Sequence, residues 1–419
     1  MTRDMTLLKT ATPFNEVSQQ LEAIASKITD IAAQLEAGTL VGAPTPTNQP
    51  LPDVLRDRLL FNVVQMRDKL REVSSAAYSQ AHPHYDRPPI TQIDTLAAVF
   101  KAFDPYFDAA LTKAEVRKAL RRVLEQYPAE VSRSLLLEHR LKADQPQVDL
   151  SLLLDPALDR GREWLAANAS GVTRDFCAAW AEAESLLNQA VETAWLEIDI
   201  PLAAQPITAP EPSVFFRLKE DADQSAIEAG LKLLNPEAGA LRRVQACLDA
   251  LPAGGSVRWA GVMARKSRNV RLCLDLPKES IKLYLQGLGW QGDAEQLDLL
   301  VAGFTKLTDL VIVAIELTPA GMLNTLGFEC RYQFNRQPEI EPRWSALLAM
   351  LVKARLCSEE KQSALLNWNG VFHEPFDIDG KAQILVRNLS HVKIGFEPGV
   401  AVTAKAYISC NVRDFKATR

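Results

Sequence analysis

Charged and aromatic side chains recur at every second position in several stretches of the C-terminal half. In the stretch TAWLEIDI, which begins at Thr193, the apolar residues alternate with Trp195, Glu197 and Asp199. This alternation is typical of a β-strand with one buried face. The charged residues on the opposite, polar faces are Glu197, Asp199, Arg217, Arg271, Asp275, Glu329, Arg331, Arg387, His391, Lys393 and Lys405, interleaved with Trp195, Phe215 and Tyr407. A face with this mixture could hold an anionic ligand, or a peptide segment lying along the strands.

The composition is typical of a globular protein and excludes several other classes. The 419 residues are 47% apolar and 24% charged, and the net charge is −5, which excludes a globally basic nucleic-acid binder. No apolar run reaches 18 residues, so we expect no membrane span. None of the six cysteines forms a CxxC pair, which favours reduced thiols and a cytoplasmic location over a zinc site.

Short catalytic motifs are absent from the sequence. It contains no GxGxxG or GxxxxGK[ST] phosphate loop, no GxSxG nucleophile elbow and no DDxxD-like cluster. His82 and His84 flank Pro83 and could ligate a metal, but the turn-rich composition around them favours a solvated loop. Any chemistry must therefore come from side chains that the fold brings together.

The first 190 residues have the period of helices. Apolar spacing predicts helices near 15–37, 53–79, 93–107, 111–126, 155–168 and 173–192, with an exposed linker near 38–52. We therefore expect a mainly helical domain over residues 1–190, followed by a domain of different architecture over residues 191–419.

A strand, strand, helix, helix order recurs about four times from residue 194 onward, and the last copy lacks its helices. The predicted strands are near 194–200, 213–219, 256–263, 269–276, 309–317, 323–334, 382–396 and 400–412. The helices between them are predicted near 223–234, 236–251, 279–288, 294–307, 343–356 and 359–368. The apolar strand faces need cover, which these helices can supply.

Two architectures accommodate the remaining polar face. In an open antiparallel sheet, helices cover one side and water the other. In a closed barrel, the helices lie outside and the polar face lines a lumen. An ordinary solvated sheet seldom needs this mixture of arginine, aromatic and acidic residues, which favours the barrel. The predicted fold class is α+β, with a helical N-terminal half followed by ββαα units in an antiparallel sheet or barrel.

Helix-covered antiparallel strand pairs around a polar lumen resemble the ABBA, or PT-barrel, aromatic prenyltransferases. The residues that carry the resemblance are Lys405 and Tyr407 in AKAYIS, Lys393 in HVKI and Arg271 in VRLCL. The resemblance covers residues 190–412. The chain departs from the family in having about four strand pairs, whereas the family closes its barrel with five, and in its long helical N-terminal half.

The resemblance implies transfer of a prenyl group from an allylic diphosphate to an aromatic or peptide acceptor, as in secondary metabolism. It implies that Arg271, Arg331, Lys393 and Lys405 bind the diphosphate. It further implies that Trp195 and Tyr407 shield the cationic intermediate, and that Glu197 or Glu329 handles the acceptor proton. Because no DDxxD-like cluster is present, a metal need not be a permanent part of the site, although magnesium could accompany the diphosphate.

A non-enzymatic binding module is the alternative. The same lumen could hold an anionic ligand or a peptide, with the helical half as a partner-docking domain. A carboxylate across the cavity from the cations would favour catalysis, whereas cations with no carboxylate nearby would favour binding. Neither function involves nucleic acid.

Overall fold

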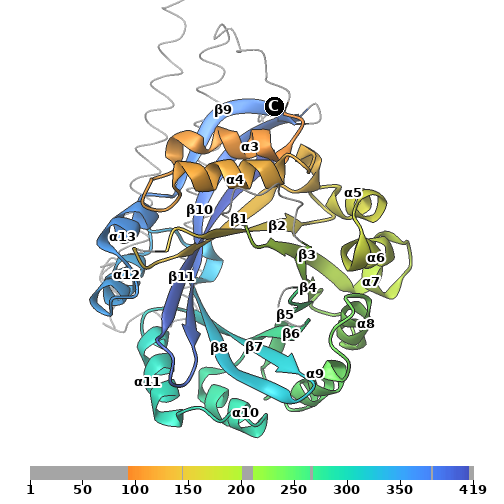
Figure 1. Ribbon diagram of the computed structural model, residues 1–419, viewed down its shortest axis with the longest axis vertical. Coiled ribbons are helices and arrows are strands. Elements are labelled where there is room, and N and C mark those ends of the chain that lie inside the picture. The colour runs from red at the N-terminus through yellow and green to blue at the C-terminus, as the bar shows by residue number, and fades with distance from the viewer. Residues whose placement is uncertain (1–92, 144, 201–210, 265–267, 379–380, 415–419) are drawn as a thin grey trace, which may run out of the picture.

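The computed structural model describes residues 93–143, 145–200, 211–264, 268–378 and 381–414. Among these residues, ten antiparallel strands close into a barrel, because β11 pairs with β10 on one side and with β1 on the other (Figure 1). The strands of the barrel are β1 (Ser134–Arg140), β2 (Val148–Leu154), β3 (Val191–Ile198), β4 (Ser213–Leu218), β5 (Ser256–Val262), β6 (Val270–Asp275), β7 (Leu310–Thr318), β8 (Gly321–Arg331), β10 (Lys381–Phe396) and β11 (Thr403–Asp414). The closed barrel confirms the predicted fold class and decides against the open sheet.

Helices surround the barrel on its outside (Figure 1). After each of the first four strand pairs, the chain forms two or three helices before it returns to the sheet. The helices before β1 are α3 (Leu96–Ala102) and α4 (Ala114–Leu124), and those between later strands are α5 (Gly161–Asn168), α6 (Gly171–Ala181), α7 (Leu186–Ala190), α8 (Ser225–Leu233), α9 (Ala240–Asp249), α10 (Ile281–Gly287), α11 (Ala294–Thr305), α12 (Arg343–Lys353) and α13 (Glu359–Leu366). A further strand, β9 (Gly370–Ile378), pairs with β10 and is not a member of the barrel.

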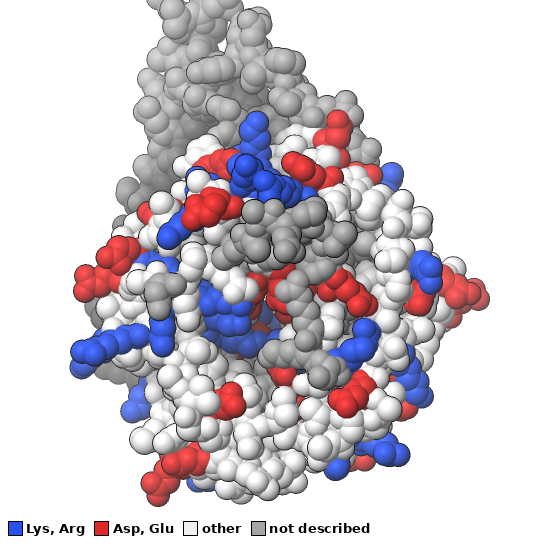
Figure 2. Space-filling model, in the orientation of Figure 1, with Lys and Arg blue, Asp and Glu red and all other residues white. Residues whose placement is uncertain are grey.

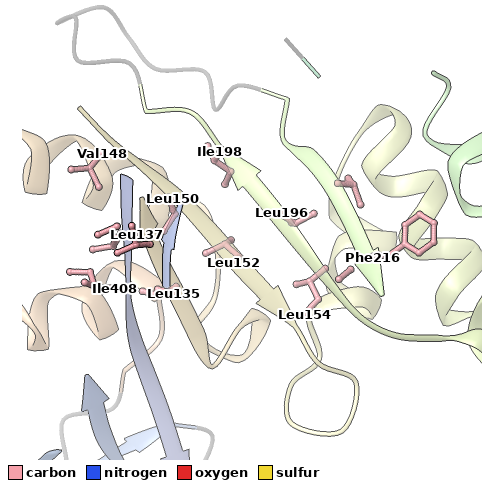
Figure 3. Close-up of a cluster of buried hydrophobic side chains, with 14 of the residues drawn as sticks. Leu135, Leu137, Val148, Leu150, Leu152, Leu154, Leu196, Ile198, Phe216 and Ile408 are labelled. Atoms are coloured by element: carbon pink, nitrogen blue, oxygen red, sulfur yellow. The ribbon is translucent and has the colours of Figure 1, made fainter. Parts of the chain in front are cut away.

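The hydrophobic core lies between the barrel and the helices. Leu137, Leu152 and Leu196 point outward from adjacent strands and are fully buried (Figure 3). On β8, Leu326 and Phe328 are buried in the same core, as the alternating faces predict. Fully burying one such side chain contributes about 1.5–3 kcal/mol, so the outward positions fix which strand face points into the lumen.

Two strands lie within the half of the chain that the pattern assigned mainly to helices. β1 and β2 supply a fifth strand pair, where the sequence indicated about four. They were missed because Leu136 and Leu153 are apolar at lumen-facing positions, which hides the alternation. The barrel therefore begins well before residue 191. The predicted helices near 15–37 and 53–79, the linker and the loop with His82 and His84 lie outside the described residues.

A bulge in β10 changes the face on which one predicted lumen residue lies. Leu389 pairs with Ile408, whereas His391 pairs with Tyr407, so one residue between them has no partner in the register. A one-residue slip moves the side chains before it to the opposite face. Arg387 therefore lies outside the barrel, stacked at 4.0 Å over the ring of Tyr106, and the prediction that it shares the polar face is wrong.

Candidate functional site in the barrel lumen

The inward-facing side chains line one cavity in the middle of the barrel. Its lining residues are Leu136, Ser151, Trp195, Glu197, Phe215, Trp259, Arg271, Cys273, Glu329, Arg331, His391, Lys393 and Tyr407. Figure 2 shows basic and acidic side chains gathered around a hollow near the centre of the molecule. The cavity has a volume of about 40 Å³, which is room for a few water molecules. The lumen is thus polar, and it is nearly filled by its own side chains.

Seven of the eight site residues predicted from the sequence line this cavity. They are Glu197, Glu329, Arg271, Arg331, Lys393, Trp195 and Tyr407. The eighth, Lys405, is not among the lining residues, but it shares the carboxylate of Glu138 with Tyr407. The barrel therefore brings together residues that are spread over more than 200 positions of the chain.

Arg271 and Lys393 are each held by a carboxylate on a neighbouring strand. Arg271 Nη2 donates to Glu316 Oε1 at 2.5 Å, and Lys393 Nζ donates to Glu329 Oε1 at 3.3 Å. Gly327 makes room for the lysine, because a Cβ there would lie 2.7 Å from Lys393 Cε. The two cations are thereby fixed in place at the wall of the lumen.

Glu329 interacts with two of the predicted cations. Its second oxygen accepts a hydrogen bond of 3.0 Å from Arg331 Nη2, in addition to the contact with Lys393. Burial opposes ionisation of Glu329, but Lys393 and Arg331 outweigh it and hold the pKa of this carboxyl well below its ordinary value. Glu329 is therefore ionised, and its two oxygens accept hydrogen bonds from Arg331 and Lys393.

Glu138 is a functional candidate that the sequence did not reveal. It accepts hydrogen bonds from Lys405 Nζ at 2.7 Å and from the Tyr407 hydroxyl, and it forms an ion pair of 3.1 Å with Arg140. Burial opposes its ionisation, but Lys405 and Arg140 outweigh that and hold its pKa well below the ordinary value. Only recognition of β1 could have found this residue, because its partners on β11 lie far away in the sequence.

Glu197 differs from the other carboxylates of the lumen. Within the described part of the chain, it makes no hydrogen bond and no ion pair. Burial raises the pKa of Glu197, and the charges of Arg271 and Lys393 offset part of this effect. Glu197 lines the same cavity as both cations.

Aromatic rings cover much of the lumen wall. Trp195 lies edge-on to Trp259, with ring centroids 6.3 Å apart, and Phe215 lies 5.9 Å below the guanidinium of Arg271. Phe215 occupies its position because Gly261 on the paired strand has no Cβ, which would lie 2.4 Å from the ring. The lumen thus presents π faces beside its charges.

His391 stacks on Tyr407 across the β10–β11 pair, with ring centroids 4.0 Å apart. Burial, assisted by Arg331, holds the pKa of His391 well below its ordinary value, so the imidazole is neutral. Burial and the nearby Glu138 carboxylate raise the pKa of Tyr407, so its hydroxyl keeps its proton. Both rings therefore act as uncharged walls at neutral pH.

Neither a metal-binding cluster nor a membrane-spanning helix occurs among the described residues. The described ranges contain no group of three or more His, Cys, Asp or Glu side chains arranged to hold a metal ion. In the same ranges, no helix is both long and apolar enough to cross a membrane.

Comparison with known proteins found similarity only among solved structures. No protein-family model and no curated protein matches the chain. The chain is similar to AnaPT from Neosartorya fischeri, with 12% identity and a TM-score of 0.44 over 80% of this chain and 97% of that one. It is also similar to the prenyltransferase PriB in its apo form, with 14% identity and a TM-score of 0.44 over 75% of this chain and 94% of that one. PriB in a ternary complex with L-tryptophan and dimethylallyl thiolodiphosphate gives 14% identity and a TM-score of 0.43, with the same coverage.

Proposed function

We propose that the lumen binds an allylic diphosphate and transfers its prenyl group to an aromatic or peptide acceptor. The observation that supports this most strongly is the isolated carboxylate of Glu197. It has no ion-pair partner in the described ranges, and it shares the cavity with cations and aromatic rings. A carboxylate whose pKa is raised by burial is a stronger base than an exposed one.

The diphosphate would bind to Arg271, Lys393, Lys405 and Arg331. An ammonium has three N–H donors and a guanidinium five, so the carboxylates that hold these side chains leave donors free for an anion. When the donor ionises, the bond between the prenyl carbon and the diphosphate oxygen breaks, and its electron pair leaves with the diphosphate. The cations stabilise the charge that develops on this leaving group.

The allylic cation would then be shielded by Trp195 and Tyr407 until it reacts. A bond forms between the prenyl carbon and a carbon of the acceptor ring, and the ring proton moves to the carboxylate of Glu197. Glu329, the other carboxylate predicted to take this proton, is committed to Lys393 and Arg331. We therefore assign it the role of positioning these cations.

Substrate binding requires side chains of the lumen to move. An allylic diphosphate is larger than the present cavity of about 40 Å³. Glu316, Glu329 and Glu138 are held by Lys and Arg side chains, and the carboxylates of the described ranges do not form a metal-binding group. A magnesium ion would therefore come with the diphosphate oxygens, and no step above depends on it.

A binding module for an anionic ligand is the second candidate. It is favoured by the small volume of the cavity, about 40 Å³. Both candidates place an anion in the lumen. They differ in whether the bond between the prenyl carbon and oxygen breaks.

The test is incubation of the full chain with dimethylallyl diphosphate, with and without a panel of aromatic acceptors. We expect diphosphate release and a prenylated product from the wild type. E197Q should still ionise the donor but form product at least 100-fold more slowly, in line with the usual contribution of a general base. E220Q, which changes an exposed glutamate after β4, is the control and should behave like the wild type. If the wild type binds dimethylallyl diphosphate but neither cleaves it to release free diphosphate nor forms a prenylated product, the binding module is the correct function.

A further inference from the structure

A groove lies on the outside of the barrel, between α11, α12 and the segment that leads from β10 into β11 (Figure 1). Its volume is about 570 Å³, within the range of roughly 300–1,000 Å³ that is typical of sites for small organic ligands. No described residue lines both this groove and the cavity in the lumen. The groove is therefore separate from the candidate site in the lumen.

Apolar side chains form most of the wall of this groove. They come from Leu299, Leu300, Phe304, Met350, Leu351 and Leu356. Phe304 and Leu351 belong to the core between the barrel and the helices, whereas Leu299 is 75% exposed. Gly303 of α11 also lines the groove, and a Cβ at its position would meet nothing within 4 Å. The groove thus exposes apolar surface, and covering this surface with an apolar ligand would be favourable.

Two cations also line the groove, Lys142 after β1 and Arg355 after α12. The segments that carry them meet, because Ser358 N–H donates to Leu141 O at 3.1 Å. In addition, Lys361 Nζ donates to Lys142 O at 2.7 Å. In the described part of the chain, neither Lys142 nor Arg355 has an ion-pair partner. An ammonium and a guanidinium at the edge of an apolar groove are suited to a ligand with an anionic head group and an apolar chain.

We propose that this groove binds a fatty-acid anion, with its alkyl chain along the apolar wall and its carboxylate beside Lys142 and Arg355. The carboxylate accepts charge-assisted hydrogen bonds from the two cations. The flexible thioether side chain of Met350 can adapt to an alkyl chain. An amphipathic helix of a partner protein could also cover an apolar groove, but the two cations without ion-pair partners favour a ligand that carries its own carboxylate. This site does not depend on the proposed prenyl transfer, because it lies outside the barrel.

Calorimetric titration of the full chain at pH 8 tests the proposal. The probes are laurate, decanoate, uncharged dodecyldimethylamine oxide and cationic dodecyltrimethylammonium, each below its micelle-forming concentration. We expect laurate to bind about tenfold more tightly than decanoate, because it buries two more CH₂ groups. Laurate should also bind at least tenfold more tightly than the uncharged probe, and the cationic probe should bind most weakly.

Two variants locate the site. G303L places a side chain in the groove and should weaken laurate binding at least tenfold; it should fold, because leucine is a better helix former than glycine and the position is open. The matched control is G287L on α10, where a Cβ also meets nothing within 4 Å but which does not line the groove. The double variant K142Q/R355Q should lose the preference for laurate over the uncharged probe, whereas K353Q, which removes a neighbouring exposed cation, should keep it.

Several results would overturn the proposal. It is wrong if laurate binds no more tightly than the uncharged probe, if G303L binds laurate as the wild type does, or if K142Q/R355Q keeps the preference for the anion. Light scattering of the wild type and G303L tests the other occupant. A wild-type dimer that G303L dissociates would make the groove an interface between copies of the chain, and the proposal would again be wrong. The outcome of the assay with dimethylallyl diphosphate bears on the lumen and not on this groove.

Discussion

Replacing Glu138 by glutamine should destabilise the protein and at the same time increase its affinity for anions. The substitution keeps the size of the side chain but removes the charge that faces Lys405 and Arg140. Arg140 retains Asp149 at 2.6 Å, whereas Lys405 has no second carboxylate among the described residues. The lysine is then free to bind a diphosphate.

The expected cost in stability follows from these contacts. Breaking a fully buried ion pair costs about 3–5 kcal/mol, and a hydrogen bond to a charged group contributes about 1.5–3 kcal/mol. The Lys405 side chain is 32% exposed, so water solvates part of its charge once Glu138 is neutral. We therefore expect E138Q to lower the free energy of unfolding by about 2 kcal/mol at pH 7.

Urea denaturation of the wild type and E138Q at several pH values measures this cost and its origin. Because the pKa of Glu138 is depressed in the folded state, its stabilisation is present above the ordinary value of 4.5 and is lost as the pH falls below it. The difference in the free energy of unfolding between the wild type and E138Q should therefore shrink by about 1.4 kcal/mol for each pH unit below 4.5. Calorimetry with pyrophosphate at pH 7 should show tighter binding by E138Q.

The matched control is E228Q on α8, which removes the carboxylate of an exposed pair with Lys232 at the same 2.7 Å distance. It should cost only about 0.3–0.5 kcal/mol and leave pyrophosphate binding unchanged. A cost for E138Q that is equal to the control, or that stays constant from pH 7 to pH 3, would refute the electrostatic explanation. Weaker pyrophosphate binding by E138Q would refute the link between Glu138 and the anion site.

Three further predictions concern the barrel and its thiols. G261A should lower the free energy of unfolding by about 1–3 kcal/mol in urea denaturation, because the new Cβ would lie 2.3 Å from a backbone oxygen and 2.4 Å from the Phe215 ring. The control is G287A, because a Cβ at that position meets nothing within 4 Å. K405Q should weaken pyrophosphate binding about tenfold in calorimetry but cost less stability than E138Q, because Glu138 keeps Arg140 and Tyr407; equal costs would contradict this order. All six cysteines are buried and free, and burial raises their thiol pKa values. The reaction of the thiols with Ellman's reagent at pH 8 should therefore show no fast phase until urea is added. A fast phase in the native protein would disprove their burial.

The sequence predicted the lumen well wherever polar and apolar residues alternate strictly. β3 and β8 show this alternation, and Glu197, Glu329 and Arg331 face the cavity as expected. Prediction failed where the alternation is broken. Apolar Leu136 on the lumen face of β1 hid that strand and with it Glu138, and the bulge in β10 could not be read from residue types. Which carboxylate contacts which cation depends on register between distant strands, so the sequence alone could not distinguish the paired Glu329 from the isolated Glu197.

The pairing of charges in the lumen explains how the barrel can accommodate buried cations. Buried cations without partners would destabilise the fold, so Glu316, Glu329 and Glu138 neutralise Arg271, Lys393 and Lys405. Under the proposed function, a diphosphate would share these cations with the carboxylates, which lowers its affinity but leaves the donors already oriented towards the lumen. Glu197 is outside this arrangement, since no described cation forms an ion pair with it. A carboxylate used only for structure would be expected to have such a partner, and its absence is the reason to assign Glu197 to the acceptor proton.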